Sequence, residues 1–144
     1  MKRYFETTRD IDAPANEVWK VLVDVGRWPS WTPTVRSVER LESEPMQVGS
    51  RAVVRQPKLP RAMWQVTGIA DGREFTWEST SPGVRTIARH QVLPDGEVSR
   101  VVLSIEHTGP LSGVAALLWG RLTQRYIELE AKSLDAFVTR TPAA

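Results

Sequence analysis

The middle of the chain alternates hydrophobic and polar residues with a period of two, which is typical of strands with one buried face. This pattern predicts strands over residues 4–11, 34–42, 50–56, 61–70, 73–80, 84–93 and 98–108. Between the first two strands, apolar residues at 18, 19, 22 and 23 have helical spacing and predict a short helix over about 14–24. Residues 27–31 predict a second short helical turn. We therefore expect one strand, two short helices and a six-stranded meander.

A long helix is expected after Gly109-Pro110 ends the last strand, because only two glycines interrupt the sequence from Leu111 to about Val138. Such a helix is roughly 40 Å long at 1.5 Å per residue. At 100° per residue, Glu130 falls inside its apolar sector. That sector is predicted to hold Leu111, Ala115, Leu118, Trp119, Leu122, Tyr126, Leu129, Ser133 and Phe137. The fold class is α+β, with a twisted, curved seven-stranded antiparallel sheet wrapped around the long C-terminal helix.

Two Asp-Gly pairs, at 71–72 and 95–96, separate strand patterns and predict two-residue type I′ turns. With these turns, residue 93 pairs with 98, and residue 68 with 75. This register also predicts which side chains lie on the inner face of the sheet. They are residues 52, 54 and 56, Trp64, Val66, Gly68, Phe75, Trp77, Ser79, Val84, Thr86, Ala88, His90, Val101, Leu103, Ile105 and His107.

Composition narrows the class of protein. The 144 residues fit one domain, with a core over about 3–138. The 19 basic and 17 acidic residues are interspersed, which argues against nucleic-acid binding. The absence of cysteine excludes disulfides and fits a cytoplasmic location. We expect no signal peptide and no membrane span, because no apolar run is long enough.

Tryptophan is the unusual component, with six in the chain. These large rings, each with one N–H to satisfy, predict an aromatic interior or a lined pocket. Trp28 and Trp31 flank Pro29 in the segment after the first helix. We expect one of them to line the pocket and the other to pack the segment down, and the sequence does not show which.

Several short motifs occur in a characteristic order. They are Ile11-x-Ala13-Pro14 with Val18-Trp19, Trp28-Pro29-x-Trp31-x-Pro33, Gly49, His90 ahead of Pro94-Asp95-Gly96, and Thr108-Gly109-Pro110-Leu111. In these motifs the chain resembles the START-like (SRPBCC) superfamily, and within it the polyketide cyclase/dehydrase-type branch. The resemblance implies the helix-grip fold, a deep cavity between sheet and long helix, and apolar ligands such as polyketides, lipids, sterols, quinones or aromatic compounds. It also points to a bacterial protein. Some members are carriers and others are cyclases, so no catalytic residue is carried over.

The residues themselves offer few candidates for chemistry. No cofactor is expected. A metal site is not expected either, because the predicted pairing places His107 six residues beyond the partner of His90, so that the two histidines are about 20 Å apart. His90 is the best acid–base candidate, and the alternative is a hydrogen-bonded interior histidine. Tyr126 and Glu130, four residues apart, are candidates to bind or protonate a ligand oxygen. The alternative for Glu130 is a place at the sector's edge, where its carboxylate reaches water or a basic side chain.

The leading hypothesis is a carrier or sequestering module for a hydrophobic small molecule. The predicted ligand-binding residues are Gln56, Trp64, Val66, Phe75, Trp77, Thr86, Ala88, His90, Leu103, Leu118, Leu122 and Tyr126. The alternative is a polyketide cyclase/dehydratase-type enzyme, in which His90 moves a proton while Tyr126 and Glu130 orient the carbonyl. A third class, a partner-binding domain, needs an exposed apolar patch, of which the sequence shows no sign. Whether the chain is an enzyme or a homodimer is left open.

Overall fold

The computed structural model describes residues 3–140. The chain order is β1 (Tyr4–Ile11), α1 (Ala15–Val23), the 3-10 helix η1 (Val25–Ser30), β2 (Ser37–Arg40), β3 (Arg51–Arg55), β4 (Ala62–Ala70), β5 (Glu74–Ser81), β6 (Val84–Asp95), β7 (Val98–Thr108) and α2 (Ser112–Arg140). The strands form one antiparallel sheet in the order β1-β7-β6-β5-β4-β3-β2. The predicted fold class and element order are confirmed, although the second predicted strand, 34–42, is reduced to β2.

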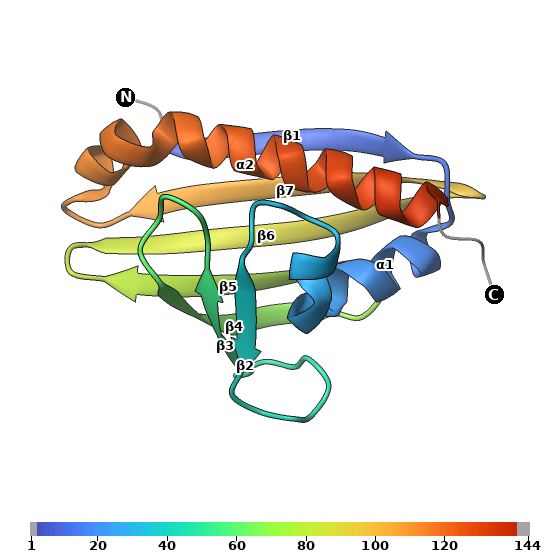
Figure 1. Cartoon of the computed structure of the whole chain (residues 1–144), viewed down its shortest axis with the longest axis horizontal. Helices are drawn as coiled ribbons and strands as arrows, with labels where there is room; N and C mark the ends of the chain where they lie inside the picture. The colour runs from blue at the N-terminus through green and yellow to red at the C-terminus, as the bar shows by residue number, and fades with distance from the viewer. Residues whose placement is uncertain (1–2, 141–144) are drawn as a thin grey trace.

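The long helix α2 lies along β1 and β7, and the far side of the sheet curves round to face it (Figure 1). Two loops, 31–36 and 56–61, rise from the β2 and β3 side toward α2 (Figure 1). Helix α1 packs against α2, β6 and β7. The sheet, the long helix and these two loops therefore surround one interior space.

The last hairpin is displaced by two residues from the predicted register. Asp95 pairs with Val98 and His90 with Leu103, so Gly96 and Glu97 are the central turn residues. Only Gly96 has a positive φ, 67°, so the predicted type I′ turn is wrong. Because side chains alternate with a period of two, a two-residue shift keeps every side chain on its predicted face. His107 consequently lies four residues beyond the partner of His90, not six, or about 13 Å along the strand.

The β4–β5 hairpin departs from the prediction in another way. Its turn has three residues, 71–73, and Ile69 rather than Gly68 pairs with Phe75. An irregularity between Val66 and Gly68 then restores the predicted pairing of Val66 with Trp77. The predicted inward position of Gly68 is therefore wrong, and Ile69 packs against the core in its place.

Helix α2 is rotated by about one residue from its predicted phase. The fully packed positions are Ser112, Ala115, Ala116, Gly120, Ile127, Ala131, Leu134 and Val138. Small residues on this face allow close approach to β1: a Cβ added at Gly120 would lie 3.1 Å from Phe5 Cζ. Leu118, predicted to face inward, is 63% exposed, and Leu111 is 48% exposed. The phase prediction failed because it followed the large leucines rather than the small residues at the contact.

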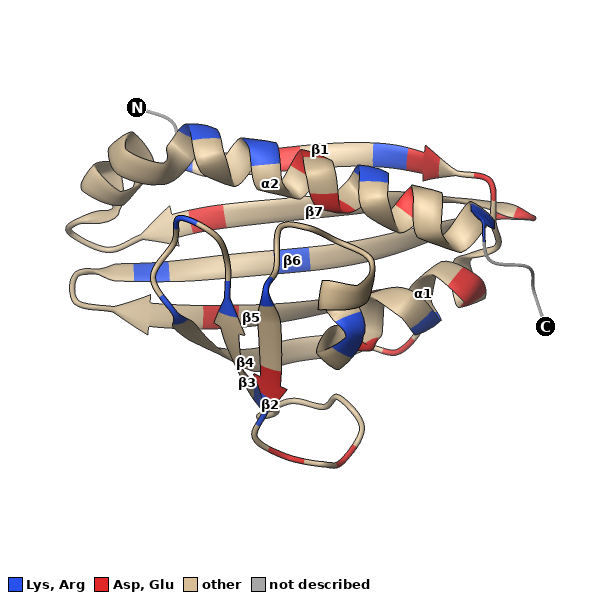
Figure 2. Cartoon of the chain, viewed as in Figure 1, with Lys and Arg blue, Asp and Glu red and all other residues tan. Residues whose placement is uncertain are grey.

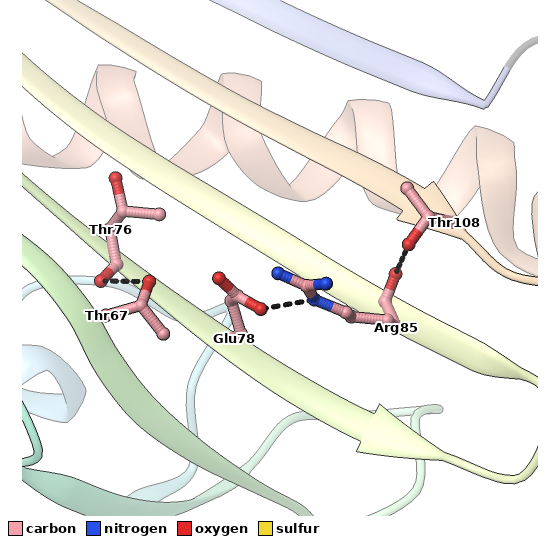
Figure 3. Close-up of polar contacts among 5 residues, drawn as sticks. All are labelled: Thr67, Thr76, Glu78, Arg85 and Thr108. Atoms are coloured by element: carbon pink, nitrogen blue, oxygen red, sulfur yellow. Dashed lines mark hydrogen bonds and ion pairs between the residues drawn. The ribbon is translucent and has the colours of Figure 1, made fainter.

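The convex face of the sheet, which points away from α2, is mostly polar. Figure 3 shows Arg85 of β6 paired with Glu78 of β5 across neighbouring strands. Beside them, Thr108 donates a hydrogen bond to the Arg85 carbonyl oxygen at 3.3 Å. Thr67, at the irregularity in β4, contacts the Thr76 carbonyl at 3.5 Å. Ion pairs near the surface, such as this one, typically contribute little to stability.

Candidate functional site

A cavity of about 410 Å³ lies between the concave face of the sheet and α2. This volume is in the range of small-molecule sites. The sheet contributes Trp64, Trp77, Thr86, Ala88, His90, Ile105 and His107 to its wall. Helix α2 contributes Ala115, Trp119, Thr123, Tyr126, Ile127 and Glu130. Val54 of β3 also lines the cavity, and the two loops contribute Val35, Gln56, Leu59, Pro60 and Arg61.

A cluster of aromatic rings forms one part of the wall. Trp28 is 4% exposed, and its indole N–H donates to the Leu22 carbonyl at 2.9 Å. Its ring lies edge-on to Trp77, with centroids 5.3 Å apart, and Trp77 stacks on Trp64 at 5.6 Å. Trp31 packs against Trp28 from outside the cavity. These rings form a rigid apolar surface, because each is held by its neighbours and has few rotatable bonds.

His90 is buried within this aromatic cluster. Its imidazole stacks on Phe75 with centroids 4.1 Å apart, and burial lowers the His90 pKa to about 4. The ring is therefore neutral near pH 7. Nδ1 lies 3.3 Å from the Phe75 carbonyl oxygen, to which it donates its hydrogen. Nε2 is then the ring's acceptor nitrogen, and the ring lines the cavity.

Glu130 is the second titratable group of the wall. Burial raises the Glu130 pKa to about 7, and a hydrogen bond from the Thr34 hydroxyl partly opposes that rise. Thr34 and Thr32 are fully buried, with their hydroxyl oxygens 2.9 Å apart. The loop 31–36 thus holds Glu130 in place from the side opposite the sheet. Near pH 7 the carboxyl group is therefore present both in its protonated form, which can donate a hydrogen bond, and in its ionised form, which can only accept one.

Tyr126 ties the β3–β4 loop to α2. Its hydroxyl donates a hydrogen bond to the carbonyl oxygen of Pro57. The next residue, Lys58, has a φ of 67°, which is uncommon for a residue with a side chain. The phenol hydrogen is therefore engaged by the loop, and in this conformation Tyr126 does not donate to a ligand. Its oxygen and ring still line the cavity.

His107 and Thr86 form a polar pair at the end of the cavity nearest the β5–β6 turn. The His107 Nδ1 lies 3.0 Å from the Thr86 hydroxyl oxygen. The His107 Nε2 is sealed from solvent and has no partner within residues 3–140. Burial lowers the His107 pKa, so this ring is also biased toward its neutral form.

The predicted site residues divide into three groups. Gln56, Trp64, Trp77, Thr86, Ala88, His90, Tyr126 and Glu130 all line the cavity. Val66, Phe75 and Leu103 are buried in the packed core and support the wall from behind. Leu118 is exposed and Leu122 is not part of the wall, because α2 is rotated from its predicted phase.

Sequence reasoning missed the contribution of the loops. Leu59 and Pro60 belong to a segment with no periodic pattern, so nothing marked them as part of a wall. Thr34 and Val35 begin the predicted strand 34–42, but the strand forms only from Ser37, and the two residues lie in the loop before it. Trp119 belongs to the predicted apolar sector of the long helix but not to the predicted ligand-binding residues, and it lines the cavity. The pair of prolines at 57 and 60 was the available signal, because such a segment is stiff enough to form a fixed wall.

Within residues 3–140 no helix is long and apolar enough to span a bilayer. In the same part of the chain, no three His, Asp or Glu side chains are grouped as metal ligands would be.

Residues 2–139 match the family model described as polyketide cyclase/dehydrase and lipid transport. No curated protein matches the chain in sequence.

Solved structures share the whole fold at low sequence identity. The Zhui aromatase/cyclase from Streptomyces sp. R1128 is 20% identical, with a TM-score of 0.77 over 96% of this chain and 94% of that one. A START superfamily protein from Mycobacterium smegmatis is 14% identical, with a TM-score of 0.78 over 96% and 99%. XoxI from Bacillus cereus is 17% identical, with a TM-score of 0.76 over 96% of each chain. At these identities the similarity establishes the START-like, helix-grip fold alone.

Proposed function

The chain belongs to the polyketide cyclase/dehydrase and lipid transport family, and from its cavity we propose that it binds an apolar aromatic small molecule bearing a hydroxyl or carbonyl group. In this role it carries or sequesters the ligand. The observation that carries the proposal is the wall itself: four tryptophans, Trp28, Trp64, Trp77 and Trp119, face a cavity of about 410 Å³. An apolar pocket with a few fixed polar groups is how small-molecule sites are usually built.

The polar groups favour a neutral ligand with a hydrogen-bonding edge. His90 Nε2 accepts a hydrogen bond from a ligand hydroxyl, since Nδ1 already holds the ring's hydrogen. Glu130 donates to a carbonyl when protonated and accepts from a hydroxyl when ionised. A lipid chain is a second possible occupant, but flat rings gain more than a flexible chain from the tryptophan faces.

A titration with 2-naphthol, followed by quenching of tryptophan fluorescence, tests binding. The wild type should show saturable quenching. Ala88→Leu should weaken binding by about tenfold or more, because Ala88 lies in the wall between Trp77 and Ile105 and overfilling a packed site costs ~1–3 kcal/mol. Arg89→Leu is the matched control, since it places the same side chain on the solvent face of β6. Equal affinity in all three proteins would refute cavity binding.

A cyclase or dehydratase is the second candidate function. The observation that favours it is the pair of ionisable groups in one cavity, with the His90 pKa shifted to about 4 and the Glu130 pKa to about 7. Such a pair suits proton transfer to and from a carbonyl substrate. The two functions differ in one observable: a carrier returns its ligand with unchanged mass, whereas an enzyme returns a cyclised or dehydrated product.

A further inference from the structure

The first two turns of α2, together with Leu111 just before them, expose four large aliphatic side chains to solvent. Leu111 is 48% exposed, Val114 52%, Leu117 71% and Leu118 63%. Val114, Leu117 and Leu118 are neighbours on the helix surface, because residues three and four apart lie side by side. We call these four side chains the α2 apolar patch. Single exposed apolar residues are ordinary, but a contiguous group marks a contact surface.

Basic residues continue the same exposed face of the helix. Arg121 and Arg125 are exposed and follow Leu117 at four-residue spacing. No acidic residue occurs from Leu111 to Ile127. Lys58 and Arg61 lie in the β3–β4 loop, which Tyr126 ties to α2 (Figure 2 shows Lys and Arg on both segments). The apolar patch therefore borders a cationic zone.

This combination matches the surface of an anionic bilayer. Apolar side chains enter the boundary between headgroups and acyl chains, while arginines stay with the phosphates. A second copy of the chain fits less well. A two-fold contact with the two α2 helices parallel would bring Arg121 and Arg125 of both copies together, and like charges oppose such a contact.

The patch also adjoins the cavity. Ala115 and Trp119 line the cavity from the same turns of α2 that expose Val114 and Leu118. A bilayer that contacts the patch therefore lies next to one wall of the cavity.

We propose that the chain docks on an anionic lipid bilayer through the α2 apolar patch together with Arg121 and Arg125. The contact is interfacial, with α2 lying on the surface rather than crossing it. The proposal does not depend on which molecule occupies the cavity, although it gives an apolar ligand a short path between bilayer and cavity.

Co-sedimentation with vesicles tests the proposal. One set of vesicles is phosphatidylcholine alone, and the other is phosphatidylcholine mixed with phosphatidylglycerol. The wild type should sediment with the anionic vesicles, and added salt should weaken this binding. Leu117→Ser with Leu118→Ser should reduce the partition coefficient by at least about tenfold. Each of Arg121→Gln and Arg125→Gln should reduce it about fivefold on the anionic vesicles.

The matched control is Leu41→Ser with Val48→Ser. These side chains are 42% and 64% exposed in the β2–β3 loop, away from α2, and their loss should leave vesicle binding unchanged. Absence of vesicle binding, or binding that survives the Leu117/Leu118 change, would overturn the proposal. So would a wild-type dimer that ignores vesicles and dissociates in the Leu117/Leu118 variant. That variant should keep the wild-type affinity for 2-naphthol, which separates this proposal from the proposed function.

Discussion

Glu130→Gln should make the protein more stable at pH 8 by up to about 3 kcal/mol, while changing its stability little at pH 5. The reason is the raised pKa: Glu130 titrates at about 7 in the folded chain against 4.5 as its ordinary value. Between these two values the folded state holds a proton that the unfolded state has lost. Stability therefore falls as pH rises from 4.5 to 7, and the loss is complete above 7, at ~1.4 kcal/mol per pKa unit. Glutamine has a similar shape and no charge, so the variant lacks this loss.

Urea unfolding at pH 5 and pH 8, followed by tryptophan fluorescence, measures the difference. Glu128→Gln is the matched control, since it removes an exposed carboxylate two residues away on the same helix. It should keep the wild-type dependence on pH. In the wild type and in both variants, His90 changes stability with pH in the direction opposite to Glu130. Its lowered pKa means that stability is lost as pH falls from 6.5 through about 4. An unchanged slope between pH 5 and 8 in Glu130→Gln would show that Glu130 is not desolvated by the cavity wall.

Phe75→Ala should cost about 3–5 kcal/mol of unfolding free energy, the largest stability loss that we expect from one side chain. Phe75 is fully buried and supports the cavity wall from behind. Its ring contacts those of Trp19, Trp28, Trp77 and His90, with centroids 4.1 to 6.4 Å away. Removing it leaves a void that these large rings cannot readily fill.

Urea unfolding at a single pH measures this loss. Met63→Ala is the control, because Met63 is 48% exposed in β4, and its loss should stay within about 0.5 kcal/mol. If Phe75→Ala does not fold, Phe75→Leu preserves the comparison with a smaller loss. A loss below about 1 kcal/mol for Phe75→Ala would mean that the aromatic cluster is not closely packed.

Strand order and facing were predictable because side chains alternate strictly along each strand. In the last hairpin, the turn lies one residue later than predicted, which shifts every cross-strand partner by two residues. His90 and Thr86 still face inward, with their partners Leu103 and His107. Even displacements do not change which face a side chain occupies. The β4–β5 hairpin shows the opposite case, since a one-residue shift near its turn exchanged Gly68 for Ile69.

The phase of α2 was harder to predict because its contact with β1 and β7 uses small residues. Ala116, Gly120 and Ala131 carry little hydrophobic signal, whereas Leu117 and Leu118 carry much and are exposed. A pattern of large apolar residues cannot distinguish a packed core from an exposed contact surface. Two members of the α2 apolar patch, Leu111 and Leu118, were therefore mistaken for part of the core.

The candidate site was predictable in part. Inward-facing positions of the strands located His90, Trp77 and Ala88 in the cavity wall. The roles of Thr34 and Pro57 were not predictable, because each depends on a loop that meets α2 from a distant part of the chain. Such contacts are set by the curvature of the sheet, which no local sequence pattern encodes.

A crystal soaked with an iodinated naphthol tests most directly whether the cavity is a binding site. Iodine density is expected inside the cavity, with the rings against Trp28 and Trp77. The ligand hydroxyl is also expected within hydrogen-bonding distance of His90 Nε2 or the Glu130 carboxyl group. Iodine found only on the protein surface, or a cavity filled by rearranged side chains, would contradict this expectation.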